Sequence, residues 1–224
     1  MSTPAPPFSL GRLVEHDPAS KGYPFLVAAR RPKTVLWAHS APVLDQGNLG
    51  SCTGNALAQW LNTDFARTNP SGTGMLLTER DAVTLYSLAT QLDSWPGTYP
   101  PADTGSSGLA VCKAGVRLKF IHSYQHVFSF TSMLMALQHT PLIVGTSWYE
   151  SMFYPDGPDA LLTVSGAVAG GHEYLILGCD VDRQQVILLN SWGEAWGDHG
   201  RARIGFEDFG ELLYAHGDAT VPVI

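Results

Sequence analysis

The chain has 224 residues, of which 45% are hydrophobic, 10% aromatic and 15% charged. This composition excludes a wholly disordered protein, because a chain of this length and apolar content can bury a sizeable core. Its 13 lysines and arginines against 20 aspartates and glutamates give a net charge of −7, with no basic stripe, so we expect no nucleic-acid partner.

The sequence carries no signal for membranes or export. No apolar run reaches the roughly 18 residues of a membrane span, and the first ten residues have neither a basic nor an apolar region. Three cysteines cannot all pair, unlike the even-numbered framework of a secreted disulfide protein. We expect a cytoplasmic location, a reducing environment and no membrane partner.

The composition of residues 1–40 predicts an N-terminal arm. They are rich in proline and locally basic, and contain no periodic segment long enough for a helix of about 10 to 12 residues. We expect the arm to cross the body of the protein as an extended strap, with one short strand near Thr34 to Trp37.

Helical patterns follow the arm. Apolar residues at helical spacing after the Gly50-Ser51 break predict a long buried helix with Cys52 in its first turn. Thr78 and Asp81 resemble a capping box and predict the start of a second helix. The expected helices cover residues 52–67, a stretch from 78 onward, 106–119 and 131–138, and residues 93–108 are expected to form a surface loop.

After Phe120 the pattern changes to β-like runs. Strands are expected over 141–147, 174–181 and 186–190. Because the predicted helices precede the predicted strands, we expect an α+β chain with two unlike halves that meet at a groove. We expect a mainly helical lobe over 41–125 and a mainly β lobe over 126–224, together forming one unit.

Cys52 differs from the other cysteines because it opens a helix. Backbone N–H groups and the helix dipole stabilise a thiolate there, and the thiolate is the nucleophilic form of cysteine. Gln46 lies six residues earlier, where its amide can donate to an oxyanion beside the Cys52 N–H. Cys112, in an apolar helical stripe, and Cys179, inside an apolar strand, are expected to be structural thiols.

Several short motifs follow one another in a distinctive order. They are Gln46-Gly47, Gly50-Ser51-Cys52, Gly171-His172, Asn190-Ser191-Trp192-Gly193, Trp196-Gly197 and Gly200. In this order they resemble the papain family of cysteine peptidases over roughly residues 42–206. The resemblance implies a helical left lobe with the nucleophile, a β-barrel-like right lobe with the His and Asn, and an active-site groove between them.

The resemblance implies a catalytic set. Cys52 would attack a carbonyl carbon, and His172 would hold the ion pair and later protonate the leaving amine. Asn190 would orient the imidazole, and Gln46 would donate to the oxyanion. Trp192 would shield the hydrogen bond between Asn190 and His172 from water.

The resemblance also implies substrate-binding residues. Gly105 and Ser106 stand where family members bind an extended substrate by backbone hydrogen bonds, although a plain helix-capping loop would explain the same sequence. Gly171 and Trp192 are expected to border the same groove. Glu173 would border the pocket for the second substrate residue before the scissile bond and favour Lys or Arg there, unless strand alternation turns it away from the cleft.

Two departures from the family pattern concern the nucleophile segment. Leu49 and Thr53 stand where the family has a disulfide-forming cysteine and an aromatic residue, and both fit a reduced compartment. Forty residues before the catalytic segment are too few for the family's long inhibitory propeptide, so we expect control of activity to be local or absent. A group of bacterial papain-like proteins is similar in its nucleophile segment and short arm.

We expect no metal and no cofactor. His122 and His126 have an i, i+4 spacing that a metal could use, but no further ligands are apparent nearby, and we expect both to be surface histidines.

The leading hypothesis is a cysteine peptidase that hydrolyses peptide bonds of a peptide or protein through a thioester acyl-enzyme. The same residues could serve an acyl transferase, a peptide ligase or a peptidoglycan amidase, because the acceptor is chosen by water exclusion in the cleft. A non-catalytic peptide-binding module is the remaining alternative.

Overall fold

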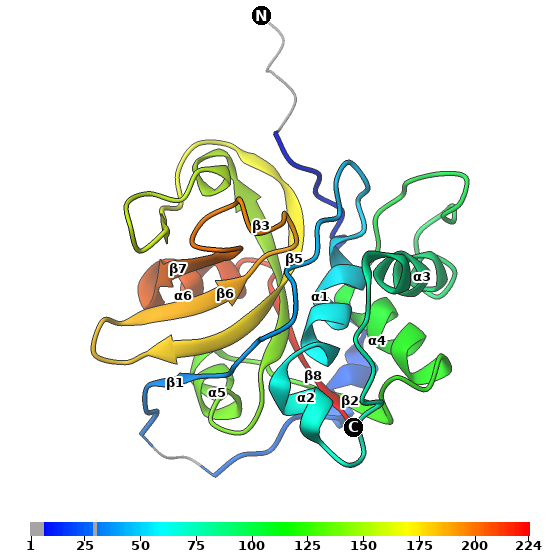
Figure 1. Ribbon diagram of the computed structural model, residues 1–224, viewed down its shortest axis with the longest axis horizontal. Helices are drawn as coiled ribbons and strands as arrows, with labels where there is room; N and C mark the ends of the chain where they lie inside the picture. Colours follow the sequence, from blue (N-terminus) through cyan, green and yellow to red (C-terminus); the bar gives the residue numbers. More distant parts are fainter. Residues whose placement is uncertain (1–6, 29–30) are drawn as a thin grey trace, which may run out of the picture.

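The structure is a computed structural model that describes residues 7–28 and 31–224; residues 1–6 and 29–30 of the expected arm lie outside the described residues. The first four helices gather on one side of the molecule, and a large sheet lies on the other together with the last two helices (Figure 1). This mixture of helices and strands confirms the predicted α+β class.

The helices follow the predicted order. Thr78 caps α3 as expected, because its backbone N–H donates to Asp81 Oδ2 at 2.8 Å and completes a capping box. The bounds are α1 (Cys52–Leu61), α2 (Asp64–Thr68), α3 (Glu79–Ala89), α4 (Gly108–Arg117), α5 (Phe130–Ala136) and α6 (Phe206–Tyr214), with short 3-10 helices η1 (Pro18–Gly22) and η2 (Glu150–Phe153).

The single helix predicted over 52–67 is wrong. The chain leaves the helical conformation at Thr63, whose Oγ1 donates to the Trp60 carbonyl at 2.6 Å and accepts the Ala66 N–H at 3.2 Å. Threonine favours such a break because its side chain satisfies backbone groups that a continuous helix would bond. The apolar spacing continues through the break, so periodicity could not locate it.

The sheet is antiparallel except where β4 pairs with β7. Its order is β2-β8-β3-β5-β6-β7-β4, and β1 pairs with β5. The bounds are β1 (Val35–Leu36), β2 (Ser123–His126), β3 (Leu142–Tyr149), β4 (Leu161–Leu162), β5 (Val168–Asp180), β6 (Gln185–Leu189), β7 (Arg201–Gly205) and β8 (Asp218–Val223). β5 begins before the predicted strand at 174 and therefore contains His172 and Glu173.

The two faces of the sheet enter different hydrophobic clusters. Leu175 and Leu177 of β5 pack with the helices α1, α3 and α4, whereas Tyr174 and Ile176 pack with Trp148 and the residues of the opposite layer. This is the alternation that a pleated strand imposes on successive side chains. Because β3, β5 and β6 serve both clusters, the boundary of the two predicted lobes at residue 125 stays a prediction.

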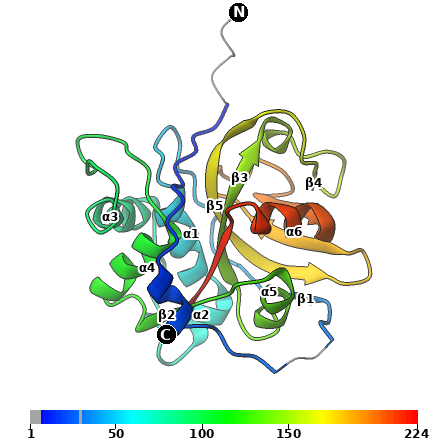
Figure 2. The ribbon, with the colours of Figure 1, turned by 180° about the vertical axis from the view of Figure 1, so that it is seen from behind.

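The N-terminal arm is extended over its described residues, as predicted, except for the short 3-10 helix η1. It runs down between the helices and the sheet and then reaches β2 (Figure 2). There the Phe25 N–H donates to the His126 carbonyl at 2.8 Å. β1 then pairs with β5 inside the expected range 34–37.

The two histidines of the possible metal pair have different surroundings. His122 is exposed, as predicted, but His126 is only 8% exposed, which contradicts its prediction. β2 is covered by the arm, a contact between distant segments, and burial lowers the pKa of His126. Within the ranges 7–28 and 31–224, no group of three or more His, Cys, Asp or Glu could hold a metal ion.

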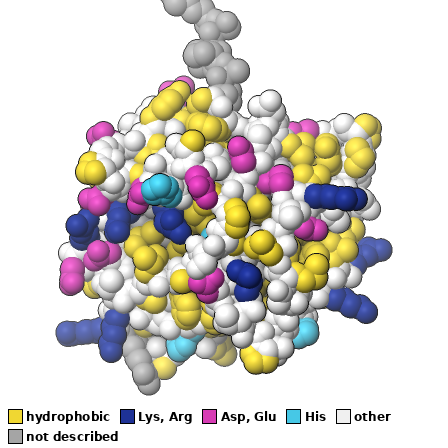
Figure 3. All heavy atoms as spheres, in the orientation of Figure 1, with side chains coloured by type: hydrophobic (Ala, Val, Ile, Leu, Met, Phe, Trp, Pro, Cys, Tyr) yellow, Lys and Arg dark blue, Asp and Glu magenta, His cyan; other side chains and the backbone are white. Residues whose placement is uncertain are grey.

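Charged side chains of both signs are interspersed on the face seen in Figure 3. In the described part of the chain, none of the helices has the length and apolar character needed to cross a bilayer.

We expect Gly54→Ala to destabilise the protein. A Cβ at Gly54 would overlap the Ala82 carbonyl oxygen and lie 2.9 Å from the Tyr86 nitrogen, so α1 and α3 would have to separate. Overpacking of this kind costs about 1–3 kcal/mol, more than the ~1 kcal/mol of helix propensity that alanine adds. Urea unfolding should show the loss, while Gly22→Ala, with nothing within 4 Å of its Cβ, should unfold like the parent. Equal stability of Gly54→Ala and the parent would contradict this packing.

Candidate active site

Cys52 is the first residue of α1 and is fully buried. Burial raises the pKa of its thiol to about 12, and the backbone amides of Glu173, Gly11 and Thr53 act in the opposite direction. The sulfur therefore lies where the start of α1, the strand β5 and the arm meet. In this arrangement the thiol is neutral, although the helix start offers the N–H groups that stabilise a thiolate.

His172 bonds to Asn190, as predicted: Nε2 lies 2.7 Å from Asn190 Oδ1. The same oxygen accepts the Ser191 N–H at 2.7 Å, which fixes the amide so that Nε2 is the donor. Burial lowers the pKa of His172 to about 4, with the Asn190 bond acting in the opposite direction, so the ring is neutral. Nδ1, which has no hydrogen-bond partner among the described residues, is then the basic nitrogen.

Gln46 joins the nucleophile segment to the loop after Asn190. Its Oε1 accepts the Ser191 hydroxyl at 2.6 Å, and its backbone N–H donates to the Ser191 carbonyl at 2.9 Å. These bonds direct Nε2 into the groove, where it donates to the carbonyls of Ser9 at 3.2 Å and Leu49 at 2.9 Å. The amide expected to serve an oxyanion thus binds a peptide carbonyl of the arm.

Trp192 lies between the histidine and the arm. Its ring stacks on His172 with centroids 4.7 Å apart, and it stacks on Phe8 at 4.6 Å. Its indole N–H donates to the Ser9 carbonyl at 3.3 Å. The indole therefore covers the imidazole, as the sequence predicts, and also borders the groove.

The arm occupies the groove through its backbone. The N–H groups of Gly11 and Arg12 donate to the Gly171 carbonyl at 3.2 and 3.0 Å. The Leu13 N–H donates to the Ser106 carbonyl at 2.7 Å, and the Ser106 N–H donates to the Gly11 carbonyl at 2.8 Å. Two residues expected to bind an extended substrate therefore bind an extended segment of the chain itself.

The loop before α4 both caps the helix and lines the groove. Ser107 Oγ accepts the Ala110 N–H at 3.0 Å, which is the helix-capping alternative. Gly105 has a φ of +71°, and a Cβ there would overlap the Gly11 carbonyl oxygen. A glycine at 105 thus lets the arm approach, and the loop both caps α4 and binds the arm, while substrate binding by Gly105 and Ser106 stays a prediction.

Glu173 lies on the face of β5 that is turned toward the helices, opposite to His172. Its buried carboxylate lies beside Arg12, with Oε2 3.8 Å from Nε. The Arg12 guanidinium also binds Asp218: Nε donates to Oδ2 at 3.0 Å, and Nη2 donates to the same oxygen. Burial, and next the charge of Asp218, raise the pKa of Glu173, while Arg12 lowers it.

Most of the predicted site residues thus contact the arm, but sequence reasoning missed two residues beside them. Asp218 begins β8, outside the motif-bearing stretch, and a lone aspartate carries no pattern. Arg12 counted only as one of the basic residues of the arm. The excess of basic residues in the arm of an acidic protein is the one signal that could have suggested a contact with acidic groups.

No protein-family model matches the chain, and no curated protein matches it. Among solved structures, xylellain, a cysteine protease from Xylella fastidiosa, aligns over 100% of this chain and 98% of that chain, with a TM-score of 0.78 and 16% sequence identity.

Two further solved structures are similar. Bromelain from Ananas comosus, in complex with the inhibitor E64, aligns over 87% of this chain and 100% of that chain, with a TM-score of 0.61 and 16% identity. A digestive procathepsin L 3 of Tenebrio molitor aligns over 96% of this chain and 76% of that chain, with a TM-score of 0.64 and 16% identity. At these identities the likeness establishes the fold, and it confirms the predicted one: the chain has the fold of the papain-like cysteine proteases.

Proposed function

We propose that the chain is a cysteine peptidase that hydrolyses peptide bonds through a thioester on Cys52. The main support is the extended peptide already seated in the groove beside Cys52, bound by the backbones of Ser106 and Gly171. Main-chain bonds of this kind recognise an extended backbone of any sequence. A groove that holds the chain's own arm in this way offers the same partners to a substrate.

The chemistry follows from the hydrogen bonds around the imidazole. Once the arm has left, His172 Nδ1 takes the proton of the Cys52 thiol, and the sulfur attacks the substrate carbonyl carbon. The electron pair moves onto the carbonyl oxygen, which accepts hydrogen bonds from Gln46 Nε2 and the Cys52 N–H. Collapse breaks the C–N bond, and the amine leaves with the proton from Nδ1.

Water completes the cycle. His172 Nδ1 takes a proton from a water molecule as its oxygen attacks the thioester carbon. Collapse releases the carboxylic acid, and the sulfur recovers its proton. Asn190 and Trp192 hold the imidazole in one orientation through both steps, because one bonds Nε2 and the other stacks on the ring.

Cys52→Ala should lower hydrolysis of a fluorogenic peptide by at least about a thousandfold, because loss of the nucleophile removes the covalent step. Cys112→Ser and Cys179→Ser should fold less well yet keep the activity, since both thiols are buried in the hydrophobic clusters. Mass spectrometry after iodoacetamide treatment should find the label on Cys52. Near-parental turnover by Cys52→Ala would refute the proposal, and labelling without hydrolysis of any peptide would favour the binding module.

The pH profile of kcat/KM should be bell-shaped. The covered site raises the pKa of Cys52 to about 12 and lowers that of His172 to about 4, because both groups are buried. Displacing the arm admits water, so the thiol pKa falls, the imidazole pKa rises, and a thiolate–imidazolium pair forms at intermediate pH. Asn190→Ala should lower the maximum of kcat/KM roughly tenfold or more, and the profile should keep both its acidic and its basic limb. A simple rise with thiol ionisation would show that His172 does not partner Cys52.

Product analysis separates hydrolysis from acyl transfer. We expect the carboxylic acid to remain the main product when an amine is added, because water far exceeds a dilute amine as an acceptor for the thioester once the arm has left. A product in which the added amine has replaced water would instead favour the transferase or ligase alternatives.

A further inference from the structure

Asp103, in the loop between α3 and α4, bonds the peptide unit that joins Leu49 to Gly50. Its Oδ2 accepts the Gly50 N–H at 2.8 Å, a contact between residues 53 positions apart in the chain. A Cβ at Gly50 would lie only 2.9 Å from Asp103 Oδ1, so any larger residue there would push the carboxylate away. The bond therefore joins the segment just before Cys52 to a loop on the far side of α3.

The other oxygen of Asp103 is fixed from inside the protein. Asp103 Oδ1 accepts the hydroxyl of Tyr86, a fully buried residue of α3, at 2.5 Å. The hydroxyl oxygen in turn accepts the Gly105 N–H at 2.9 Å. Burial, and next the bond to Asp103, raise the pKa of Tyr86, so the phenol keeps its proton and continues to donate. Asp103 is exposed to solvent, but each of its oxygens has a protein donor.

The same peptide unit holds Gln46 from its opposite side. The N–H and C=O of a trans peptide point in opposite directions, so the Leu49 carbonyl is turned away from Asp103. This carbonyl accepts Gln46 Nε2 at 2.9 Å. The amide nitrogen has a second hydrogen, which is directed to the groove and bonds the Ser9 carbonyl at 3.2 Å. The hydrogen bonds therefore connect Asp103, through one peptide unit, to the amide that would serve the oxyanion.

We propose that Asp103 is a positioning residue for the hydrolysis: it holds the Leu49–Gly50 peptide so that Gln46 keeps one N–H directed at the oxyanion. The inference rests on the proposed peptidase function for the role of Gln46. Asp103 bonds Gly50 and Tyr86 and touches no reacting atom, so it acts through Gln46.

The two anchors of Gln46 fix different parts of its amide. The Ser191 hydroxyl binds Oε1 at 2.6 Å, but the terminal torsion of a glutamine is broad, so this bond alone leaves the direction of the N–H groups loosely set. The bond from Nε2 to the Leu49 carbonyl removes that freedom. Because a donor displaced by ~1 Å can lower a rate by up to about a hundredfold, loss of the second anchor should lower kcat.

The geometry distinguishes a hydrogen-bonding role of Asp103 from a role of its charge. In Asp103→Asn the amide oxygen can still accept the Gly50 N–H, and the amide nitrogen can donate to the Tyr86 oxygen. Asp103→Ala removes both bonds. Positioning by hydrogen bonds therefore predicts that asparagine retains most of what alanine loses, whereas a role of the negative charge would be lost equally in both variants.

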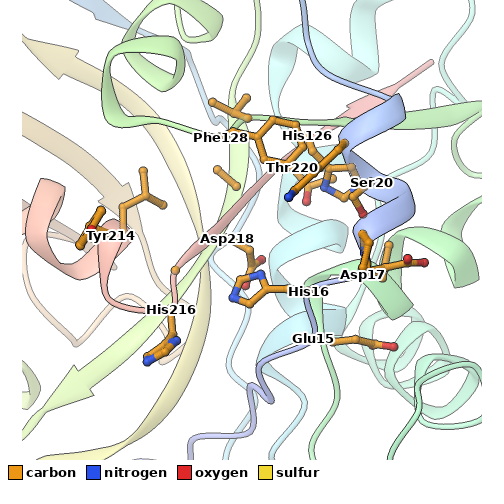
Figure 4. A pocket seen from close by; sticks show the side chains of 17 residues that line it. Glu15, His16, Asp17, Ser20, His126, Phe128, Tyr214, His216, Asp218 and Thr220 are labelled. Carbon is orange, nitrogen blue, oxygen red and sulfur yellow. The ribbon is translucent and has the colours of Figure 1, made fainter.

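A second aspartate offers a matched control. Asp17 is also exposed, and its carboxylate accepts the Ala19 N–H at 2.8 Å. It lines a pocket of about 430 Å³ between η1 and β8, where Figure 4 shows His16 beside Asp218 and Asp17 farther along. Gln46 does not line this pocket. Asp17→Ala therefore removes the same kind of bond without a connection to the oxyanion donor.

The kcat for a fluorogenic peptide at saturating concentration tests the proposal, because it is measured with substrate in the groove. Asp103→Ala should lower kcat about tenfold, while Asp103→Asn and Asp17→Ala should stay within about threefold of the parent. Gln46→Ala should itself lower kcat about a hundredfold. Adding Asp103→Ala to Gln46→Ala should change kcat by less than about threefold, because the amide that Asp103 positions is already absent.

Three results would overturn the proposal: a parent-like kcat in a folded Asp103→Ala protein, an Asp103→Asn protein as slow as Asp103→Ala, or losses that multiply in the double variant. Circular dichroism and thermal unfolding establish that each variant is folded. If Asp103→Ala does not fold, Gly50→Ala takes its place, because its Cβ displaces the carboxylate. The same loss of kcat is expected from it, and the same absence of a further loss in Gln46→Ala.

Failure of the proposed function would give a different result. If neither the parent nor any variant hydrolyses a peptide, the proposed function fails, and Asp103 is judged by the NMR signals of the Gln46 side-chain amide. These signals should shift in Asp103→Ala and stay in place in Asp17→Ala. Such a shift would retain the positioning of Gln46 by Asp103, and unchanged signals in Asp103→Ala would overturn it.

Discussion

Adjacent residues of β5 face opposite sides of the sheet, and the site depends on this alternation. His172 points to the side of Trp148 and Trp192, where it meets Asn190. Glu173 points to the helices, where it meets Arg12. The pairing with β3 fixes the register, and a slip of one residue would exchange the two environments, placing a carboxylate against the tryptophans and an imidazole beside Arg12.

Desolvation decides the chemical state of the site. All the groups that the proposed chemistry needs are present, yet both the thiol and the imidazole are neutral because protein atoms surround them. A thiolate–imidazolium pair in that environment would be unfavourable, because its loss of hydration would not be offset by hydrogen bonds from the protein. The arm is part of this surrounding, since Gly11 lies beside the sulfur and Phe8 covers Trp192. The burial to which the arm contributes therefore also keeps the Cys52 thiol neutral.

The features that could be predicted from the sequence are those encoded locally. Cys52 at a helix start, Gln46 before it and the segment around Asn190 each carry their signal within a few residues, and the structure bonds Gln46 to the residue after Asn190. The break at Thr63, the burial of His126 and the place of Asp218 depend on contacts between segments far apart in the sequence, which no local pattern records. Glu173 lies between these cases: alternation correctly predicted that it turns from the face of His172, but not that it meets Arg12 of the arm there.

The way the arm is held explains how a peptide could replace it. Four of its bonds are main-chain bonds to Gly171 and Ser106, which any extended peptide can make. The close approach at Gly11, where a Cβ would overlap the Gly50 carbonyl oxygen, fixes the depth of the arm but adds no charge pairing. Two charged side chains of the arm add contacts of their own: Arg12 binds Asp218, and the Glu15 carboxylate accepts the Ser107 hydroxyl. An extended peptide that reproduces the backbone bonds would therefore exchange them at nearly equal free energy, and it would have to offset the side-chain contacts of the arm to displace it.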